Sequence, residues 1–328
     1  CTSQRDFGTK LVILNEIPLE RTYDAGEHIT TDRTKKFLKR LRANGAPGPN
    51  GFAGSVLKEN VDGCSPILTK VIQACLNYVK VPQSWRGSIL CPIHKQGSHT
   101  DPSNYRLIAL LDVEGKVFAS NLLEDLETWV NNSKILHFSQ SGFRPKSSTL
   151  DNSIALAYMA NRARSINSPP LFCCFIDYSA AFDRVDRHIL WSKLSHWCVP
   201  PVLLQGIIAL YSQTWVKVKL DEFHVSQPFE TTKGLKQGCV LAPILFNLYM
   251  ADLPQALSKA CLSLPNIGRT KIQSLSYADD LIIFDQSKVG LQRALSALDD
   301  YNLLNGLQIN PLKTKVMIFG KYRHKMIM

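Results

Sequence analysis

Acidic residues follow two apolar segments that lie about a hundred residues apart in the sequence. Residues 171–176 form a short continuous apolar run, which predicts a buried strand, and Asp177 comes directly after it. Asp279 and Asp280 occupy the expected turn of a hairpin over residues 271–284. If these strands are neighbours in the centre of one sheet, the three carboxylates meet at one end of that sheet.

Carboxylates gathered in this way repel one another, so such a site requires cations, and hard oxygen ligands favour Mg²⁺. Two Mg²⁺ ions about 3.5–4 Å apart can activate an attacking hydroxyl and stabilise a leaving oxygen in phosphoryl transfer. Mn²⁺ is a possible substitute. The alternative is structural, since Asp is an ordinary turn residue and any polar residue can end a strand. Asp183 and Asp186 lie in a more polar stretch, where we expect structural or surface roles.

Three motifs connect these acidic residues with a known family. They read Phe-Ile-Asp-Tyr-Ser-Ala-Ala-Phe-Asp at 175–183, Gly-Leu-Lys-Gln-Gly-Cys-Val-Leu-Ala-Pro at 234–243 and Tyr-Ala-Asp-Asp at 277–280. The sequence resembles the reverse transcriptase domain of LINE-type (non-LTR) retrotransposons over residues 46–320. The resemblance implies an RNA-directed DNA polymerase that extends the 3′-hydroxyl of a DNA primer on an RNA template with deoxynucleoside triphosphates.

The same resemblance assigns roles around the acidic residues. It implies that Asp177 and Asp279 bind the catalytic metals with Asp280 in support, and that the backbone carbonyl of Tyr178 faces a metal. The ring of Phe182 would pack under the incoming sugar and leave no room for a 2′-hydroxyl. Without the resemblance, Phe182 is read as a core residue.

Further residues match the positions at which the family binds the nucleotide. The resemblance places Gln237 and Gly238 at the floor of the nucleotide site, where Gly allows close approach of backbone to ligand. Lys95 and Arg106 match positions that contact the triphosphate, although both could be ordinary surface charges. Lys313 matches a residue proposed to protonate pyrophosphate, and a structural or phosphate-screening role remains equally open.

The segment 140–149 resembles an insertion that contacts the template in the family. Some positions depart from the family pattern without removing an expected metal ligand, and they would weaken template or nucleotide binding: Asn50, Leu107, Ala109, Ser147 and Ala180. Two alternatives therefore stay open. One is a reverse transcriptase of the group II intron kind, which shares the core motifs, and the other is a catalytically silent RNA-binding remnant.

Hydrophobic spacing predicts the elements that must position these residues. We expect helices over 31–42, 67–79, 112–130, 150–158, 243–253 and 291–298, and strands over 85–93, 107–111, 215–220 and 223–229. The apolar faces of the helices at 112–130 and 150–158 are expected to be buried. Because strands and helices are interspersed without strict alternation, the fold class is α+β.

The resemblance makes this fold a right-hand polymerase with fingers, an antiparallel palm sheet and a thumb that is largely missing. We expect an N-terminal basic helical extension at 1–45, fingers and palm at 46–320, and the truncated start of a thumb or connector at 321–328. The chain begins at Cys1 instead of Met, which indicates a piece of a longer polypeptide. The resemblance adds an endonuclease domain on that full-length protein.

Composition agrees with a large globular chain and a polyanionic partner. The 328 residues are 45% hydrophobic and 20% charged, and the net charge of +11 suits a surface that binds nucleic acid. Nine cysteines without a Cys-x-x-Cys pair indicate neither a disulfide framework nor a zinc site, so a reducing intracellular setting is expected. No apolar run reaches the length of a membrane span. The resemblance implies both cytoplasm and nucleus.

Overall fold

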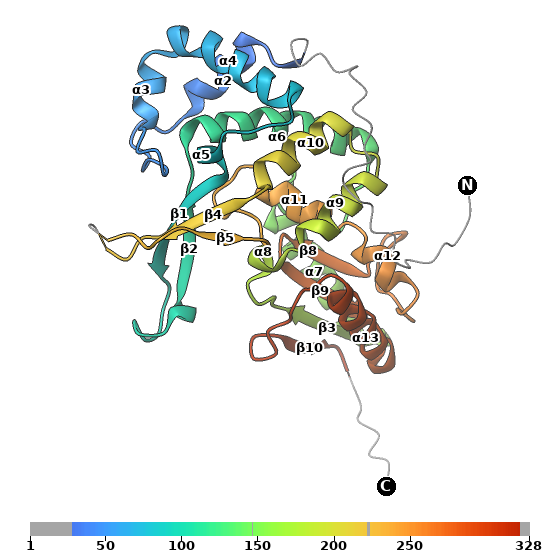
Figure 1. Cartoon of the computed structure of the whole chain (residues 1–328). Coiled ribbons are helices and arrows are strands. Elements are labelled where there is room, and N and C mark those ends of the chain that lie inside the picture. Colours follow the sequence, from blue (N-terminus) through green and yellow to red (C-terminus); the bar gives the residue numbers. More distant parts are fainter. Residues whose placement is uncertain (1–27, 146, 222–223, 322–328) are drawn as a thin grey trace.

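The computed structural model describes residues 28–145, 147–221 and 224–321 (Figure 1). The helices are α2 (Thr31–Arg40), α3 (Gly54–Glu59), α4 (Val61–Asn77), α5 (Gln83–Arg86), α6 (Val113–Ser133), α7 (Thr149–Arg164), α8 (Ala181–Arg184), α9 (Arg187–His196), α10 (Pro201–Tyr211), α11 (Ala242–Tyr249), α12 (Leu253–Ser258) and α13 (Lys288–Leu304), with a 3₁₀ turn at Pro102–Asn104. The strands are β1 (Gly87–His94), β2 (Tyr105–Leu110), β3 (Leu171–Ile176), β4 (Thr214–Val218), β5 (Phe229–Thr231), β6 (Asn266–Ile267), β7 (Thr270–Lys271), β8 (Ser274–Tyr277), β9 (Asp280–Asp285) and β10 (Lys315–Phe319).

The first of two four-stranded sheets has the order β2-β1-β4-β5 and lies beneath a group of helices. β1 pairs antiparallel with β2 and parallel with β4. The long helix α6 buries Phe118, Leu122 and Leu126, whose spacing of four residues places them on one face. That face packs against α10, while α2 contacts both α4 and α6. The result is a helical layer above a sheet whose β1–β2 hairpin projects away from it.

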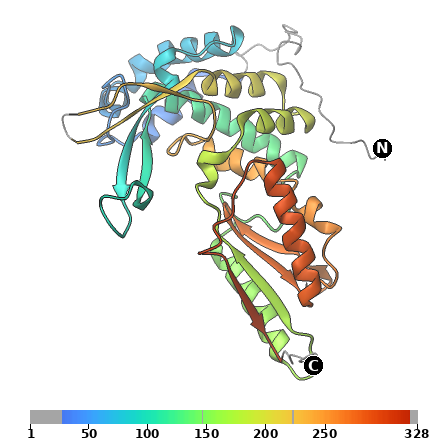
Figure 2. The ribbon, with the colours of Figure 1, turned by 60° about the horizontal axis from the view of Figure 1, so that its bottom comes forward.

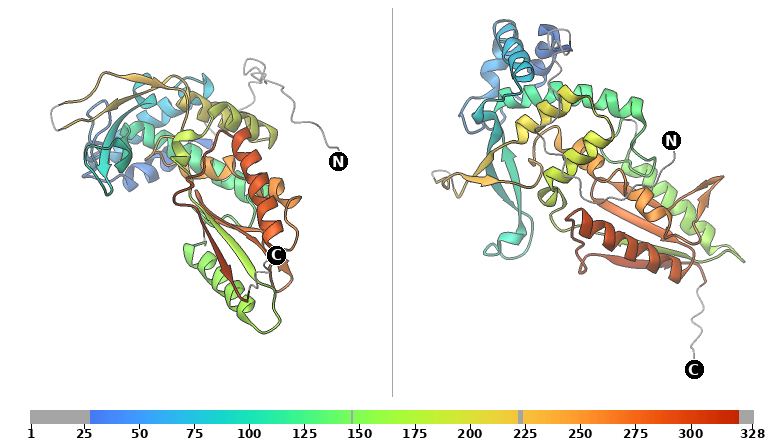
Figure 3. Two further views of the ribbon diagram at one scale, coloured as in Figure 1. Left: turned by 90° about the horizontal axis from the view of Figure 1, so that it is seen from below. Right: turned by 45° about the vertical axis from the view of Figure 1, so that its right-hand side comes forward.

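The second sheet has the order β10-β3-β9-β8 and is antiparallel throughout. Figures 2 and 3 show α13 on one face of this sheet and α7 on the other. Because successive side chains of a strand point to opposite faces, Cys174 and Ile176 of β3 join the main core while Leu171 and Cys173 join a second apolar cluster. This two-sided burial explains the continuous apolar run before Asp177.

Most predicted elements are present, with shifted ends. The strand at 171–176 is confirmed, and the α+β class is confirmed by the mixture of antiparallel sheets and helices. The strand predicted from 85 begins only at Gly87, because Trp85 belongs to the short helix α5. Asp112 precedes α6 without capping it by a side-chain bond, and its Oδ1 instead accepts a hydrogen bond from Asn50 N at 3.0 Å.

The predicted burial of the apolar face of α7 is wrong. Leu150, Ile154 and Tyr158 are 62%, 59% and 48% exposed. The buried face of α7 instead includes Ala160 and Ala163. Met159 is buried with these two alanines, so the buried face of α7 differs from the one that the spacing of Leu150, Ile154 and Tyr158 predicts.

The bounds proposed for the three parts of the chain stay predictions. Residues 1–27 of the predicted N-terminal extension and residues 322–328 of the predicted thumb or connector lie outside the described residues. In the part of the chain that the structure describes, no helix combines the length and the apolar character that crossing a membrane requires.

Arg187, the first residue of α9, joins elements of the first sheet to the loop that leads to Gln237. Its side chain is only 7% exposed. The guanidinium donates hydrogen bonds to the carbonyl oxygens of Tyr211, Thr231, Lys233 and Gly234 and to the hydroxyls of Thr214 and Thr231. This planar group with five N–H donors thus satisfies several buried acceptors at once.

We expect Arg187→Lys to lower the free energy of unfolding by about 3 kcal/mol, because a lysine cannot reach all these acceptors and those left buried without a donor are costly. Urea denaturation measures this change. The control is Arg162→Lys, which alters an exposed residue with a bond to Asn266 O and is expected to stay within about 0.5 kcal/mol of the parent. Equal losses in the two variants would contradict the assignment.

Candidate active site

The expected metal ligands meet at one end of the second sheet. β3 pairs antiparallel with β9, and Ile176 lies opposite Leu281. One step further along the same register places Asp177 opposite Asp280. Asp279 belongs to the two-residue loop that joins β8 to β9, where Tyr277 pairs with Asp280. The structure therefore brings together all three acidic residues that the sequence singled out.

The loop that carries Asp279 has an unusual backbone. Ala278, its first residue, has a φ of 56°. Gly is the usual residue at a hairpin position with positive φ, because a Cβ is crowded there. A non-Gly residue in such a conformation costs on the order of 1–3 kcal/mol, and it persists only where surrounding structure holds it. The catalytic candidates are thus attached to a strained turn.

The electrostatic environment of Asp279 reflects its neighbours. Partial burial raises the pKa of this carboxyl, and the negative charges of Asp280 and Asp177 raise it further, while Arg106 acts in the opposite direction. None of the ion pairs formed among the described residues includes any of the three acidic side chains. Their mutual repulsion is therefore not offset by a direct protein partner, which favours the binding of cations.

The donor set fits a divalent cation that is completed by substrate. Within the described ranges, no group of three or more acidic, His or Cys side chains is arranged to hold a metal ion by itself. Mg²⁺ commonly binds one or two carboxylates and keeps its remaining positions for water and substrate phosphates. Asp177 and Asp279 can hold ions in this open manner. When bound, such ions polarise an attacking hydroxyl and stabilise a leaving oxygen.

The segment before β10 runs beside Asp177. Asn310 N donates to Asp177 O at 2.7 Å, and Asp177 N donates to Thr314 Oγ1 at 3.3 Å. Lys313 is exposed next to Thr314 in the same turn. These bonds fix the backbone around Asp177 and place Lys313 at the edge of the site. The proposed proton transfer by Lys313 stays a prediction.

Tyr178 and Phe182 follow Asp177 with different orientations. The Tyr178 ring is buried and its hydroxyl donates to Asn302 Oδ1 at 3.1 Å, so the backbone of Tyr178 is the part that can face a metal. Phe182 is half-buried and stacks on Phe246 of α11, with ring centroids 4.6 Å apart and planes at 19°. This packing braces one face of the ring. The metal contact of Tyr178 and the sugar contact of Phe182 stay predictions.

The loop at Gln237 and Gly238 connects the two sheets. Gln237 O accepts a hydrogen bond from Ala109 N of β2 at 2.8 Å. Gly238 has a φ of 112°, and a Cβ there would lie 2.8 Å from Ala109 O, so a side chain is excluded by contact as well as by conformation. The Gln237 side chain donates to both carboxylate oxygens of Asp183, at 2.9 and 3.0 Å. The loop is therefore held at the wall of the site.

Asp183 is exposed and accepts the hydrogen bonds of Gln237, in agreement with the structural or surface role expected for it. Desolvation raises the pKa of Asp183, while the Gln237 bonds and the positive charge of Lys95 act in the opposite direction. Asp183 thus belongs to the cluster formed by Gln237 and Lys95, and only its position in the first motif could have indicated this. Asp186 has the expected structural role, since its carboxylate caps α9 by accepting from His188 N and Ile189 N.

Lys95 and Arg106 lie on the β1–β2 hairpin. Arg106 pairs with Ile93 in the register, and Lys95 N donates to Asn104 O at 2.8 Å just beyond it. Both side chains are exposed. The positive charge of Arg106 acts to lower the pKa of Asp279, and that of Lys95 acts to lower the pKa of Asp183. Cations on the hairpin of the first sheet therefore act on carboxylates beside the second sheet. An anionic ligand that carries its own metal ions can be held between them.

This arrangement, with carboxylates on an antiparallel sheet and cations on a facing hairpin, defines a right-hand polymerase in which the first sheet belongs to the fingers and the second to the palm. Residues 93–326 match the family model described as reverse transcriptase (RNA-dependent DNA polymerase). The chain belongs to the reverse transcriptase family. Members of this family use divalent metal ions, in agreement with the open carboxylate site.

Several relatives come from mobile elements, which confirms the resemblance to retrotransposon enzymes. The Xenopus laevis transposon TX1 uncharacterized 149 kDa protein is 24% identical over 90% of this chain and 22% of its own length. The RNA-directed DNA polymerase from mobile element jockey of Drosophila melanogaster is 25% identical over 83% of this chain and 29% of its own length. The chain thus spans less than a third of either relative.

Solved structures show the same fold. An apo telomerase from Candida tropicalis, truncated from its C-terminal domain, superposes with a TM-score of 0.54 over 83% of this chain and 57% of that one. Sequence identity is 15%. The polymerase architecture is therefore shared where little of the sequence is.

We expect Asp279→Asn to raise the melting temperature of the metal-free protein at neutral pH, on the order of 2 °C. The raised pKa means that the folded protein keeps this proton to a higher pH than the unfolded chain, so the contribution of Asp279 to stability falls as pH rises through that interval. Asparagine has no carboxyl group to ionise, so the variant does not suffer this loss of stability. Thermal unfolding with a chelator measures the melting temperature of the metal-free protein, and thermal unfolding with Mg²⁺ measures that of the protein with metal.

Mg²⁺ is expected to stabilise the parent more than Asp279→Asn, because the variant has lost a ligand charge. Asp299→Asn, at an exposed position of α13, is the control and is expected to leave both melting temperatures unchanged. A variant with the parent's response to Mg²⁺ would contradict the placement of the metal at Asp279.

Proposed function

We propose that this chain extends the 3′-hydroxyl of a DNA primer on an RNA template by Mg²⁺-dependent nucleotidyl transfer. The observation that carries the proposal is the register of β3 and β9, which sets Asp177 beside the Asp279–Asp280 turn. Membership in the reverse transcriptase family and the cations on the facing hairpin support it.

The side chains around the carboxylates suggest how a deoxynucleotide is bound. Lys95 and Arg106 would neutralise its triphosphate, and Arg106 can do so with two parallel hydrogen bonds. The loop at Gln237 and Gly238 would form the floor beneath the nucleotide. Phe182, braced by its stack on Phe246, would close the space beside the sugar. Two Mg²⁺ ions on Asp177 and Asp279 would supply charge to the attacking and leaving oxygens.

A cleft beside this site has the charge and the position for a template strand. It measures about 830 Å³ and lies between α2, α6 and β2, with Gly238 and Val240 at its margin. Arg40, Arg42 and Lys116 contribute positive charge to its lining, and two glutamates are also present. Lys116 has a lowered pKa because of desolvation. Cations that are partly stripped of water interact strongly with phosphates, which supports an RNA partner.

We also propose that the chain acts as part of a longer element protein. It covers only 22% of the transposon TX1 protein and 29% of the jockey polymerase. An endonuclease domain elsewhere on such a polypeptide would nick DNA and expose the primer 3′-hydroxyl. Work on element RNA and on chromosomal DNA would place the protein in the cytoplasm and the nucleus.

Primer extension on an RNA template with deoxynucleotides tests the polymerase. We expect Mg²⁺-dependent incorporation that falls about 1,000-fold in Asp279→Asn or Asp177→Asn, since a lost metal ligand removes several kcal/mol of transition-state stabilisation. Asp299→Asn is expected to retain full activity. RNA binding by the parent without any incorporation would contradict the proposal and favour a silent RNA-binding remnant.

Phe182→Val tests the sugar contact. A smaller side chain opens space for a 2′-hydroxyl, so we expect discrimination against ribonucleotides, read as the ratio of kcat/KM values, to fall about 10-fold or more. Phe229→Val, at a half-exposed position of β5, is the control and is expected to keep the parent ratio. Unchanged discrimination in Phe182→Val would assign Phe182 to the core alone.

A further inference from the structure

A short segment before α7 is added to the edge of the palm sheet at the metal-binding turn. Ser276 N donates to Ser139 O at 2.8 Å, and Ser141 N donates to Ser276 O at 2.9 Å. Gln140 thereby pairs in parallel with Ser276 of β8. This pairing fixes the backbone of Gln140 beside the last residues of β8, immediately before the loop that carries Asp279.

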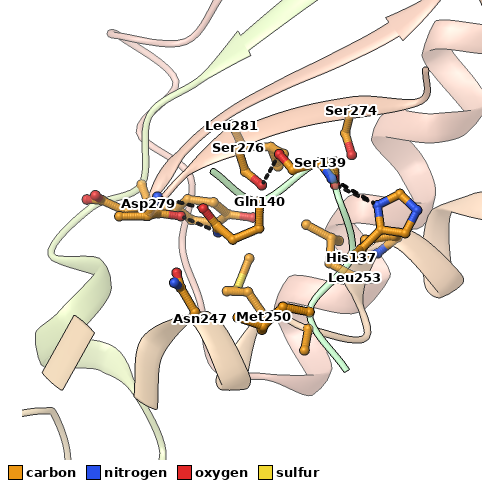
Figure 4. Close-up of a pocket in the computed structure, with 15 residues that line it drawn as sticks. His137, Ser139, Gln140, Asn247, Met250, Leu253, Ser274, Ser276, Asp279 and Leu281 are labelled. Carbon is orange, nitrogen blue, oxygen red and sulfur yellow. Dashed lines mark hydrogen bonds between the residues drawn. The ribbon is translucent and has the colours of Figure 1, made fainter. Parts of the chain in front are cut away.

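The Gln140 side chain reaches from this edge to the strained residue of the turn (Figure 4). Its Oε1 accepts hydrogen bonds from Ala278 N at 3.1 Å and from Gly142 N at 2.9 Å. Its Nε2 donates to Ala278 O at 3.4 Å. One buried amide therefore binds both backbone polar groups of Ala278, whose φ of 56° requires support from outside the turn.

Packing holds the inner side of this turn only in part. A cavity of about 20 Å³, about the space of one water molecule, is lined by Gln140, Asn247, Ala278 and Asp279 among others. Figure 4 shows Asn247 and Met250 on the far side of this space from Gln140. Where contacting atoms are missing, dispersion cannot fix a backbone. The polar bonds of Gln140 supply that constraint.

The segment that carries Gln140 packs closely against the turn at Ala278 and against α11. A Cβ at Gly142 would lie 2.3 Å from Ala278 N, so the segment and the turn touch backbone to backbone. Asn247 Nδ2 of α11 donates to Gly142 O at 2.7 Å and holds the segment from the other side. Movement of the turn would therefore break the bonds of Gln140 or displace the segment from α11.

We propose that Gln140 is a positioning residue for the metal site, which holds the Ala278 peptide so that Asp279 faces Asp177 at the separation that divalent ions require. Gln140 bonds only backbone groups and acts through Asp279. The proposal rests on the proposed function, since it assigns to this glutamine the alignment of the metal-binding carboxylates. It also gives part of the segment expected to contact template a role inside the palm.

Gln140→Met tests this role, because methionine has a similar length and forms neither bond to Ala278. Outer residues that orient metal ligands typically change affinity 10- to 100-fold. We expect the affinity for Mn²⁺, titrated by electron paramagnetic resonance in the absence of nucleic acid and nucleotide, to fall at least about 10-fold. Gln140→Asn, whose amide is one methylene shorter, is expected to show the same loss and serves if the methionine variant does not fold.

Ser141→Ala is the matched control. Ser141 lies in the same segment as Gln140, but its hydroxyl donates to Asn152 Oδ1 of α7 at 2.8 Å and not to the turn. We expect this variant to keep the parent affinity for Mn²⁺. In primer extension, we expect Gln140→Met to lower kcat with a KM for deoxynucleotide within about twofold of the parent.

Folded Gln140 variants with the parent affinity for Mn²⁺ would overturn the proposal, and so would an equal loss of affinity in Ser141→Ala. The affinity for Mn²⁺ is measured without nucleic acid and nucleotide, so this test of Gln140 is independent of the primer-extension test of the proposed function. A parent that binds Mn²⁺ but incorporates no nucleotide would contradict the polymerase, while the difference between Gln140→Met and Ser141→Ala would still decide the role of Gln140.

Discussion

The antiparallel pairing of β3 with β9 brings like charges together at one end of a buried sheet. Asp177 cannot leave this position without losing two hydrogen bonds, because its backbone N and O are bonded to Thr314 and Asn310 in the segment before β10. Asp279 cannot leave easily either, since its loop is tied to the segment at Gln140. The protein thus maintains an electrostatic repulsion that cations bound there would relieve, and the proposed metal site depends on the rigidity of its strands.

The second constraint is the distance between the two sheets. Gly238 packs closely against Ala109 O of β2, and Ala109 N donates to Gln237 O. The fingers therefore touch the loop that forms the wall of the site. Arg187 binds the start of that same loop through carbonyl oxygens that include Gly234 O. Both contacts use backbone groups, which allows the departure at Ala109 from the family pattern. The contacts between Ala109 and the loop at Gln237 and Gly238 therefore do not depend on the side chain at position 109.

Burial of β3 on both faces explains why this strand was visible in the sequence and other features were not. A run of apolar residues is required wherever helices cover both sides of a strand. By contrast, α7 buries Met159, Ala160 and Ala163 and exposes Leu150 and Ile154, so the spacing of its large apolar residues predicted the wrong face. Trp85 is buried as a strand residue would be, yet it lies in a helical turn. Hydrophobic spacing reports burial more directly than it reports the element or the face.

Residue types and motif order alone determined the family, the α+β class and the acidic residues of the candidate site, because metal chemistry demands carboxylates and a buried strand demands apolar residues. Tertiary structure alone decided which groups meet. The sequence predicted a surface or structural role for Asp183, and the exposed carboxylate has one, but only the fold shows that its partner is Gln237 and that the charge of Lys95 acts on it. Likewise, Gln140 was a polar residue in a loop until the pairing of its segment with β8 carried its amide to Ala278. Contacts between residues more than a hundred positions apart depend on strand register, which local sequence patterns do not encode.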